Sequence, residues 1–486
     1  MKILMDSDKF VHTVVTCLYL LIVLLMWSFW DPVKHDDLVR GIKILTYLCL
    51  GVYIWIAFSA YRIHKQANVY LILILLSIPF YLGDQLSILL HYQDKMMTSD
   101  HSILDGIIPN EHIYSAMFLL MACLLTFHIG YITIYDRKRN NDDSIRAREG
   151  ISRSVMRMIG MAIYLITIIP TLIARMYEMY IAISIGHLSF RLSSGQYFTG
   201  IFYFADYLSD WFVPSCFMIL IANQNRLDKI ISTMSILAYC VIYVLSGNRF
   251  EVMGIVFALA CTYIYWFEVK VPLSKIFKYS FLAFLGIIAF EVVGAARNIS
   301  SGVSMFSKEI LDSVFDRGIL YSIFETTGNT FTSIANTIRC VPAMVPYNYG
   351  KSIIGSLIYI FPSGIRNALL GDTVLHISAT LSPYYYGWTL SGYGSSYITE
   401  AYFNFGYFAI PIVMIYGGVL AVVSQNFIDK SKDNAYAFFF YIYLINEFAM
   451  AIRNDLYQTL RHVVLYVFLP YFVCRIVSIK TKNMRN

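Results

Sequence analysis

Residues 11–30 read VHTVVTCLYLLIVLLMWSFW, and this stretch decides the class of fold. It contains no Asp, Glu, Lys or Arg. A helix rises about 1.5 Å per residue, so a run of this length can cross the roughly 30 Å hydrocarbon core of a bilayer. The run is longer than the core of a signal peptide, and no small-residue cleavage site follows it. We therefore expect a retained membrane-spanning helix.

Similar apolar runs recur along the whole chain of 486 residues. Its composition is 58% hydrophobic and 14% charged, whereas a soluble protein carries roughly a quarter charged residues. We predict an all-α polytopic integral membrane protein with about twelve spans. They are expected near residues 11–30, 42–61, 68–90, 113–135, 158–182, 200–222, 230–247, 251–267, 279–296, 406–427, 437–452 and 463–479.

The distribution of Lys and Arg predicts the orientation of the spans. The most basic stretch is DRKRNNDDSIRAREGISRSVMR, residues 136–157, and we place it in the cytoplasm. Counting outward from it puts both termini in the cytoplasm, although the loop at 31–40 is then external despite Lys34 and Arg40. The charges that make up the net charge of +6 are distributed along the chain according to the predicted membrane topology. The net charge therefore does not indicate a nucleic-acid partner.

The predicted topology divides the chain into three parts. Residues 1–296 carry nine spans, 297–405 form one large external loop, and 406–486 carry three spans and a cytoplasmic tail. Within the loop, YSIFETTGNTFTSIANTI (321–338) has apolar residues at helical spacing, and IIGSLIYIFP (353–362) is too short to span. We expect interfacial or re-entrant helices there, which are tolerated where they line a polar cavity.

Arginines are unexpectedly frequent on the predicted outer side, against the positive-inside rule. Those at or beside span ends are Arg249, Arg297, Arg453 and Arg461, and those within the loop are Arg317, Arg339 and Arg366. The planar arginine fork donates two parallel hydrogen bonds to a phosphate and keeps its charge. The four at span ends favour a shared anionic ligand such as a lipid pyrophosphate. Alternatively, each extends to lipid headgroups or pairs with an acid such as Asp455 or Glu251.

Two of these arginines lie in AIRNDLYQTLRHVVLY, residues 451–466. If the preceding helix continues through this stretch, Arg453, Tyr457 and Arg461 lie on one side of it.

The candidates for a catalytic acid or base are Glu400 in GYGSSYITEAYFNFG (392–406), Asp455 and His462, with Glu291 in the span before the loop. A carboxylate or a neutral histidine can take the proton of an acceptor hydroxyl. The alternative for Glu400 is a residue at a helix start that pairs with an arginine.

An aromatic segment, SPYYYGWTLSGYG (382–394), precedes the return of the loop to the membrane. Aromatic rings stack on sugar rings, and Tyr hydroxyls can bond to sugar hydroxyls. The predicted sugar-binding residues are Tyr384, Tyr385, Tyr386, Trp388, Tyr393 and Tyr397. The alternative is an aromatic belt at the membrane interface, which the 39 tyrosines of the chain also favour.

Charged residues inside predicted spans are functional candidates. Arg175 and Glu178 can pair at i, i+3, and Asp206 and Asp210 either hold an arginine or serve proton coupling. Asp84 is a further candidate inside a predicted span. No DxD, HExxH, P-loop or GxGxxG motif occurs in a suitable context, so we expect no metal and no cofactor.

Four motifs together resemble a known family. They are SGNRFE (246–251), the segment 324–362, GYGSSYITEAYFNFG (392–406) and RND…RH (453–462). With the number of spans and the late external loop, the chain resembles the Wzy-type polymerases of O-antigen or capsular polysaccharide, which join oligosaccharide repeat units. The motifs cover roughly residues 230–470, and the remainder is similar in hydropathy only.

The resemblance implies a metal-independent glycosyltransferase with a GT-C-like fold in the bacterial cytoplasmic membrane. Donor and acceptor would both be glycans linked to undecaprenyl pyrophosphate, joined at the outer face, with Arg249, Arg297, Arg453 and Arg461 on the pyrophosphate. Further implied partners are the lipid bilayer, a chain-length regulator and a flippase. Two alternatives remain: an O-antigen ligase, and a transporter such as a lipid-linked oligosaccharide flippase, which would favour midplane charges, internal repeats and short loops.

Overall fold

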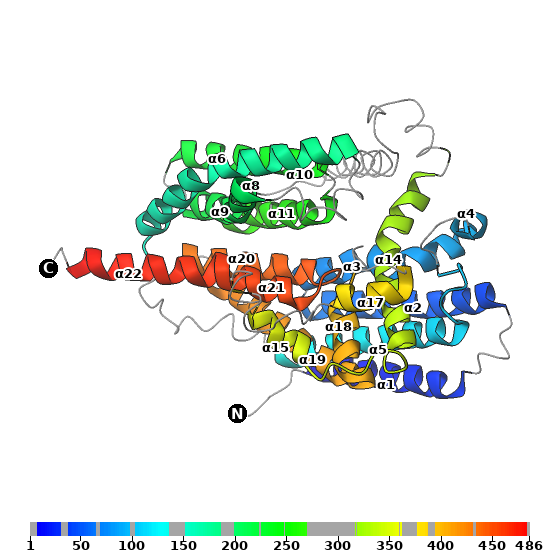
Figure 1. The fold of residues 1–486 in the computed structure, drawn as a ribbon. Coiled ribbons are helices and arrows are strands. Elements are labelled where there is room, and N and C mark those ends of the chain that lie inside the picture. Colours follow the sequence, from blue (N-terminus) through cyan, green and yellow to red (C-terminus); the bar gives the residue numbers. More distant parts are fainter. Residues whose placement is uncertain are drawn as a thin grey trace. The chain divides into compact units, whose positions relative to one another are not determined.

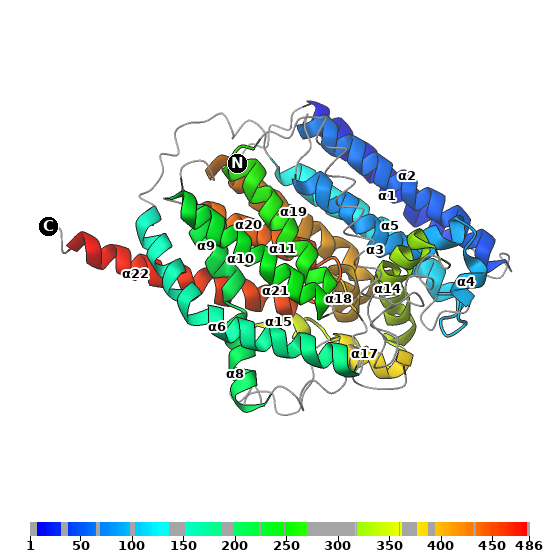
Figure 2. The same ribbon diagram turned by 90° about the horizontal axis from the view of Figure 1, so that it is seen from above.

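The computed structural model forms two compact units (Figures 1 and 2). It describes residues 7–30, 37–64, 69–97, 103–135, 151–185, 199–222, 225–246, 248–269, 316, 318–358, 360–361, 377–386, 394–430 and 434–483. Every regular element among them is a helix. The first unit comprises Met1–Asp142, Leu320–Gln425 and Ala451–Arg461, and the second comprises Asp143–Ile319, Asn426–Met450 and His462–Asn486.

The first unit is built around α5 (Asn110–Ile134). The α5 helix is apolar on all sides, as is typical of a helix that lies inside a bundle or in lipid. Of the apolar stretch of α5, 83% is buried inside the protein. The corresponding stretch of α1 (Ser7–Phe29) is only 17% buried, so most of its surface is available to lipid. The other helices that carry residues of this unit are α2 (Leu38–His64), α3 (Val69–Leu89), α4 (Gln93–Met97), α14 (Ile319–Cys340), α15 (Lys351–Ile358), α17 (Ile377–Tyr386), α18 (Tyr397–Phe405), η4 (Gly406–Phe408), α19 (Ala409–Lys430) and α21 (Leu456–Val463).

Glycines set the spacing between helices in the first unit, as small residues do in membrane bundles. A Cβ atom on Gly417 of α19 would lie 2.0 Å from the carbonyl oxygen of Phe127 on α5. On α14, a Cβ atom on Gly328 would meet the backbone nitrogen of Asp84 on α3 at 2.6 Å. Both crossings therefore bring backbone against backbone.

The α3–α14 crossing also explains the buried Asp84. Thr332 donates a hydrogen bond of 2.8 Å to the Asp84 carboxylate, which is 2% exposed. Gly328 and Thr332, four residues apart on α14, thus provide the close approach to α3 and the hydrogen-bond donor for Asp84.

The second unit is built around α9 (Phe212–Ala222), in which every residue is buried. It packs against α6 (Arg153–Ile185), α10 (Arg226–Leu245) and α20 (Ala435–Met450). A bidentate ion pair joins Arg157 on α6 to Asp228 on α10, at 2.6 and 2.9 Å. The other helices are α8 (Gly200–Ser209), α11 (Arg249–Cys261), η3 (Thr262–Trp266), η5 (Val464–Phe468) and α22 (Leu469–Asn483).

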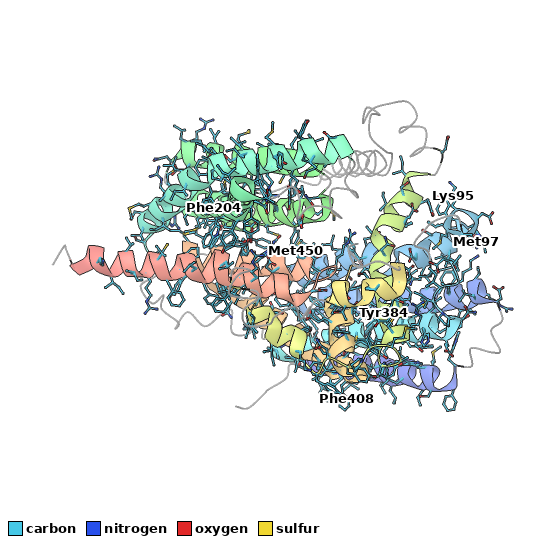
Figure 3. The ribbon with its side chains drawn as sticks, in the orientation of Figure 1. Lys95, Met97, Phe204, Tyr384, Phe408 and Met450 are labelled. Carbon is cyan, nitrogen blue, oxygen red and sulfur yellow. The ribbon has the colours of Figure 1, made fainter. Side chains whose placement is uncertain are left out.

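Most of the predicted spans coincide with helices. Among the described residues, nine helices are long and apolar enough to cross a membrane, and Glu251–Trp266 and Ala435–Met450 are shorter apolar helices. These correspond to every predicted span except 279–296, which lies outside the described residues. The structure thus confirms a multi-pass helical membrane protein. Large apolar side chains such as Phe204 and Phe408 are 62% and 76% exposed on these helices (Figure 3).

The contact of α19 with α5 makes a testable prediction. Gly417→Ala should lower the free energy of unfolding by about 1–3 kcal/mol, because the new methyl group overlaps a backbone carbonyl that cannot rotate away. Thermal unfolding of the detergent-purified chain measures the effect. The matched control is Gly51→Ala on α2, where no atom lies within 4 Å of the added Cβ. Equal stability of the two variants would contradict the close crossing.

Candidate functional site

Glu400 lies in the first turn of α18 and is 1% exposed. Its Oε1 accepts a hydrogen bond of 2.8 Å from the Ser352 hydroxyl, and its Oε2 accepts one of 2.7 Å from the backbone N–H of Leu456. A buried carboxylate needs such donors because it has left water. Glu400 therefore joins three separate segments of the chain: α15, α18 and the start of α21.

Asn404, one turn further along α18, completes this arrangement. Its amide nitrogen donates to Ser352 Oγ at 2.7 Å and to the Glu400 carbonyl at 2.8 Å. Its Oδ1 accepts from the N–H of Gly350 at 2.9 Å. Gly350 has a φ of +80°, which a residue with a side chain adopts only under strain. No role for Ser352 or Asn404 was predicted from the sequence, although both lie in the quoted motifs and Asn404 is spaced at i+4 from Glu400.

The RND segment forms a turn held against residues 395–397. The backbone N–H of Ser395 donates to the carbonyl of Arg453 at 3.2 Å, and that of Tyr397 donates to the carbonyl of Ala451 at 3.0 Å. These carbonyls bond to another segment rather than to a following helical turn, so α20 ends at Met450 and α21 begins at Leu456. The condition of one continuous helix through Arg453 and Arg461 is thus not met.

Two predicted residues, Arg453 and Asp455, lie on this turn, and a third, Arg461, lies on the helix that follows it. Arg453 is half-buried within the turn, and Asp455 is 6% exposed and interacts electrostatically with Glu400. Arg461 is half-buried on α21, five positions after Leu456. The motif pieces 348–352, 395–404 and 451–456, which are far apart in the sequence, meet in the first unit.

His462 belongs to the second unit, where its Nδ1 lies 3.3 Å from Oε1 of Glu447 on α20. The Glu447 side chain is 3% exposed and that of His462 is 33% exposed. A carboxylate on one ring nitrogen fixes the orientation of an imidazole and its tautomer. The sequence analysis did not identify Glu447.

Of the six predicted sugar-binding residues, the side chains of Tyr384, Tyr385 and Tyr397 are described. Tyr384 is 42% exposed (Figure 3), whereas Tyr385 is buried and donates from its hydroxyl to Asp105 at 3.1 Å. Tyr397 is 8% exposed and packs edge-on against Tyr81. For Tyr386 only the backbone is described, and Trp388 and Tyr393 lie outside the described residues.

One predicted external arginine has a structural explanation. Arg339, at the end of α14, donates to the carbonyl of Ile107 at 2.5 Å and to the carbonyl of Tyr384. It therefore ties α17 to the segment before α5.

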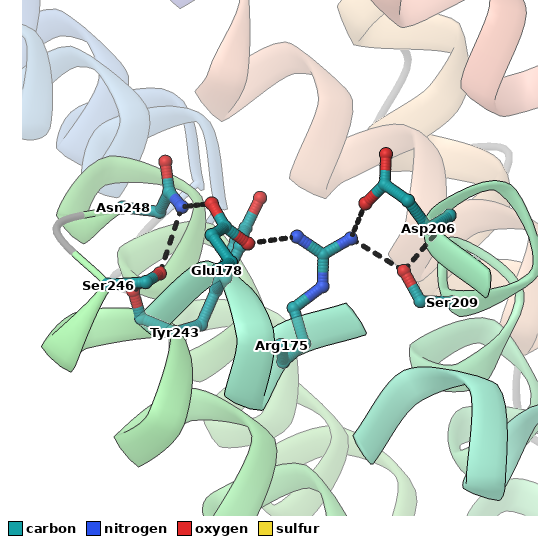
Figure 4. A network of polar contacts seen from close by, with 7 residues as sticks. All are labelled: Arg175, Glu178, Asp206, Ser209, Tyr243, Ser246 and Asn248. Atoms are coloured by element: carbon teal, nitrogen blue, oxygen red, sulfur yellow. Dashed lines mark hydrogen bonds and ion pairs between the residues drawn. The ribbon is translucent and has the colours of Figure 1, made fainter. Parts of the chain in front are cut away.

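A second polar centre lies within the second unit. Arg175 pairs with Glu178 and, at 2.6 Å, with Asp206, so the predicted i, i+3 pair and the predicted arginine partner of Asp206 are both confirmed (Figure 4). Its guanidinium also donates to Ser209 at 2.5 Å. Of the remaining predicted arginines, Arg249 is the first residue of α11, with only its backbone described, and Arg297 lies outside the described residues together with Glu291, Arg317 and Arg366.

These helices and buried polar centres define a multi-pass membrane protein, in whose first unit three motif segments meet around a carboxylate and an arginine-bearing turn. The family model described as O-antigen polysaccharide polymerase Wzy matches residues 9–485, nearly the whole chain. The chain therefore belongs to the Wzy family and is a membrane enzyme of O-antigen polysaccharide synthesis. This confirms the resemblance carried by its motifs. No curated protein and no solved structure matches the chain.

The Glu400 contacts predict a large effect on stability. Glu400→Ala should lower the free energy of unfolding by about 1–3 kcal/mol, because Ser352 and the Leu456 N–H lose their acceptor inside the protein. The control is Glu111→Ala at the start of α5, whose side chain is 65% exposed and whose removal should change stability by about 0.5 kcal/mol or less. Thermal unfolding of both purified variants gives the comparison. A Glu400→Ala protein as stable as the control would contradict the contacts.

Proposed function

We propose that this protein polymerises O-antigen repeat units at the outer face of the bacterial cytoplasmic membrane. The growing glycan, carried on undecaprenyl pyrophosphate, is transferred to a new repeat unit that is carried on the same lipid. Membership of the Wzy family over residues 9–485 is the observation that carries this proposal. No metal takes part, and the arginines supply the positive charge that the leaving pyrophosphate requires.

Arg453 is the arginine whose surroundings support this role best. Its carbonyl accepts from Ser395, and Glu400 holds the next helix start through Leu456. A binding residue on a backbone fixed from both sides needs little reorganisation when charge develops on its ligand. Arg453 therefore binds the donor pyrophosphate and stabilises it as it departs, and Arg461, Arg249 and Arg297 are its proposed companions.

His462 is the proposed base that takes the acceptor proton. Both Glu400 oxygens already accept hydrogen bonds, which favours a holding role for Glu400 over proton transfer. His462 instead keeps a third of its side chain exposed and has Glu447 at one ring nitrogen. A carboxylate at one ring nitrogen orients the imidazole, and an oriented histidine is suited to act as a general base. Asp455 and Glu400 are the other two candidates, and the variants below distinguish among the three.

The proposed placement in the membrane follows the charge pattern. Both termini are cytoplasmic, twelve spans cross the bilayer in a GT-C-like arrangement, and residues 297–405 are external between the parts 1–296 and 406–486. The helices α14, α15 and α17 within that segment support an ordered external part. The exposed Tyr384 is a candidate for stacking on the glycan. A flippase that delivers repeat units and a chain-length regulator are the proposed protein partners.

The test is the length distribution of surface glycan in the host after the gene is deleted and then restored. A polymerase predicts collapse from a ladder to a single repeat unit, with the ladder regained on restoration. Long chains that stay on the carrier lipid would instead indicate an O-antigen ligase. Loss of all external repeat units would indicate a flippase. The same test applies to a host that makes capsule and to one that makes O-antigen, although the polymer is recovered from a different place in each.

Arg453→Lys should shorten the ladder even though the positive charge remains. Loss of the two-pronged hydrogen bond, at about 1.5–3 kcal/mol for a bond to a charged group, predicts a fall in kcat/KM of roughly ten- to hundredfold. The control is Arg475→Lys on α22, near the cytoplasmic end of the last predicted span, where the guanidinium bonds to Tyr471 at 3.1 Å. If the Arg453→Lys variant is present at normal protein level and makes glycan of wild-type length, the proposed two-pronged binding of the pyrophosphate by Arg453 would be contradicted.

His462→Gln should lower kcat about 10²- to 10⁴-fold while KM changes little, because a general base acts in the chemical step. The matched control is His112→Gln, whose ring also lies beside a carboxylate, with Nε2 at 3.5 Å from Glu111. Steady-state kinetics with a lipid-linked repeat unit give both constants. If Asp455→Asn shows the loss in kcat and His462→Gln does not, the base is Asp455; the same result for Glu400→Gln would assign Glu400.

A further inference from the structure

A buried arginine organises three elements of the second unit. The side chain of Arg175 on α6 is 7% exposed and pairs with Glu178 on the same helix. It also reaches α8, where it binds Asp206 at 2.6 Å and Ser209 at 2.5 Å. The Tyr243 ring of α10 lies with its centre 4.9 Å from the guanidinium carbon. Figure 4 shows the guanidinium between the acids of the two helices.

The cluster extends from Arg175 to the turn between α10 and α11. One Glu178 oxygen faces Arg175, and the other accepts a hydrogen bond of 2.7 Å from the Asn248 amide. Asn248 is 4% exposed and also donates to the Ser246 hydroxyl at 3.1 Å (Figure 4). The turn is thus tied to α6 through a carboxylate that is itself fixed by a buried cation.

Asn248 uses its side chain in an unusual way for its position. It is the N-cap residue of α11, where asparagine commonly accepts a hydrogen bond from the first turn of the helix. Here its side chain makes no capping hydrogen bond. It contributes to the Glu178 contact instead, so the direction in which α11 starts is set by the cluster and not by a local cap.

The next residue is Arg249, which begins α11. We propose that Glu178 and Asn248 are positioning residues for Arg249, and that Arg175 holds Glu178 in place for this purpose. The inference rests on the proposed function, in which Arg249 binds the donor pyrophosphate. The hydrogen bond restricts the backbone from which Arg249 projects, so less freedom is lost when the anion binds.

A purely structural role predicts a different pattern of effects. Burying an ion cluster in a membrane helix is unfavourable unless the charges are paired, so Arg175→Ala endangers folding and is uninformative for binding. Asn248→Ala leaves the ion pairs of Arg175 with Glu178 and Asp206 in place and removes the Asn248 hydrogen bonds to Glu178 and Ser246. It therefore separates positioning from folding.

The experiment is a double-mutant cycle on the full chain in lipid nanodiscs with a lipid-linked repeat unit as substrate. Asn248→Ala should raise KM for the donor about tenfold, since a misplaced binding group loses affinity. Arg249→Ala should raise it at least as much. In the Arg249→Ala background, Asn248→Ala should have no further effect, because the residue through which it acts is gone.

Two further variants complete the design. Asn225→Ala is the matched control, since Asn225 is the exposed N-cap of α10 and also makes no capping hydrogen bond; its KM should equal that of wild type. Asn248→Asp has the same shape but places a carboxylate against Glu178, so it should raise KM more than Asn248→Ala. Thermal unfolding of each variant confirms that the protein is folded.

The outcomes separate the two levels of the proposal. Impaired Arg249→Ala with unchanged Asn248→Ala, or effects of the two variants that multiply, would overturn the positioning role and leave the proposed function intact. Arg249→Ala with wild-type KM would overturn both the assignment of Arg249 and this inference. Arg453→Lys, measured in parallel, tests the pyrophosphate clamp independently of the second unit.

Discussion

A carboxylate that leaves water inside an apolar helical bundle must receive hydrogen bonds or a cation from the protein. Glu400 meets this constraint with the Ser352 hydroxyl and the Leu456 N–H, which come from segments far apart in the chain. Satisfying the acid therefore fixes the turn between α20 and α21. The course of residues 451–456 in the first unit depends on this interaction more than on any local preference for helix.

The same constraint recurs in the second unit with a different solution. Glu178 is satisfied by Arg175 on one side and by the Asn248 amide on the other. In each unit a buried acid thus holds the backbone beside an arginine, Arg453 in one and Arg249 in the other. In the proposed reaction, in which a pyrophosphate is bound and then released, rigid backbone next to a long, charged side chain limits the reorganisation needed.

Much of the fold was predictable because membrane helices need long apolar runs, and these are visible in the sequence. The runs predicted α1, α2, α3 and α5 closely, and local spacing predicted the Arg175–Glu178 pair. The close crossings were not predictable, because whether Gly417 or Gly328 meets a backbone depends on which helix lies opposite. The predicted spans 437–452 and 463–479 left a gap here, but the contacts that hold the turn at 451–455 were not predictable, since they come from the distant Glu400 and residues 395–397.

By itself, the sequence determined the multi-pass helical class, the motifs that carry the family resemblance, and the residue types that a pyrophosphate and a proton transfer require. Hydropathy and residue chemistry are local properties, so they can be read without coordinates. Only the tertiary structure decided that Ser352, Asn404 and Leu456 surround Glu400, that Glu447 orients His462, and that Asn248 binds Glu178. Hydrogen bonds act over about 3 Å, and which groups come that close is set by helix packing across long stretches of chain.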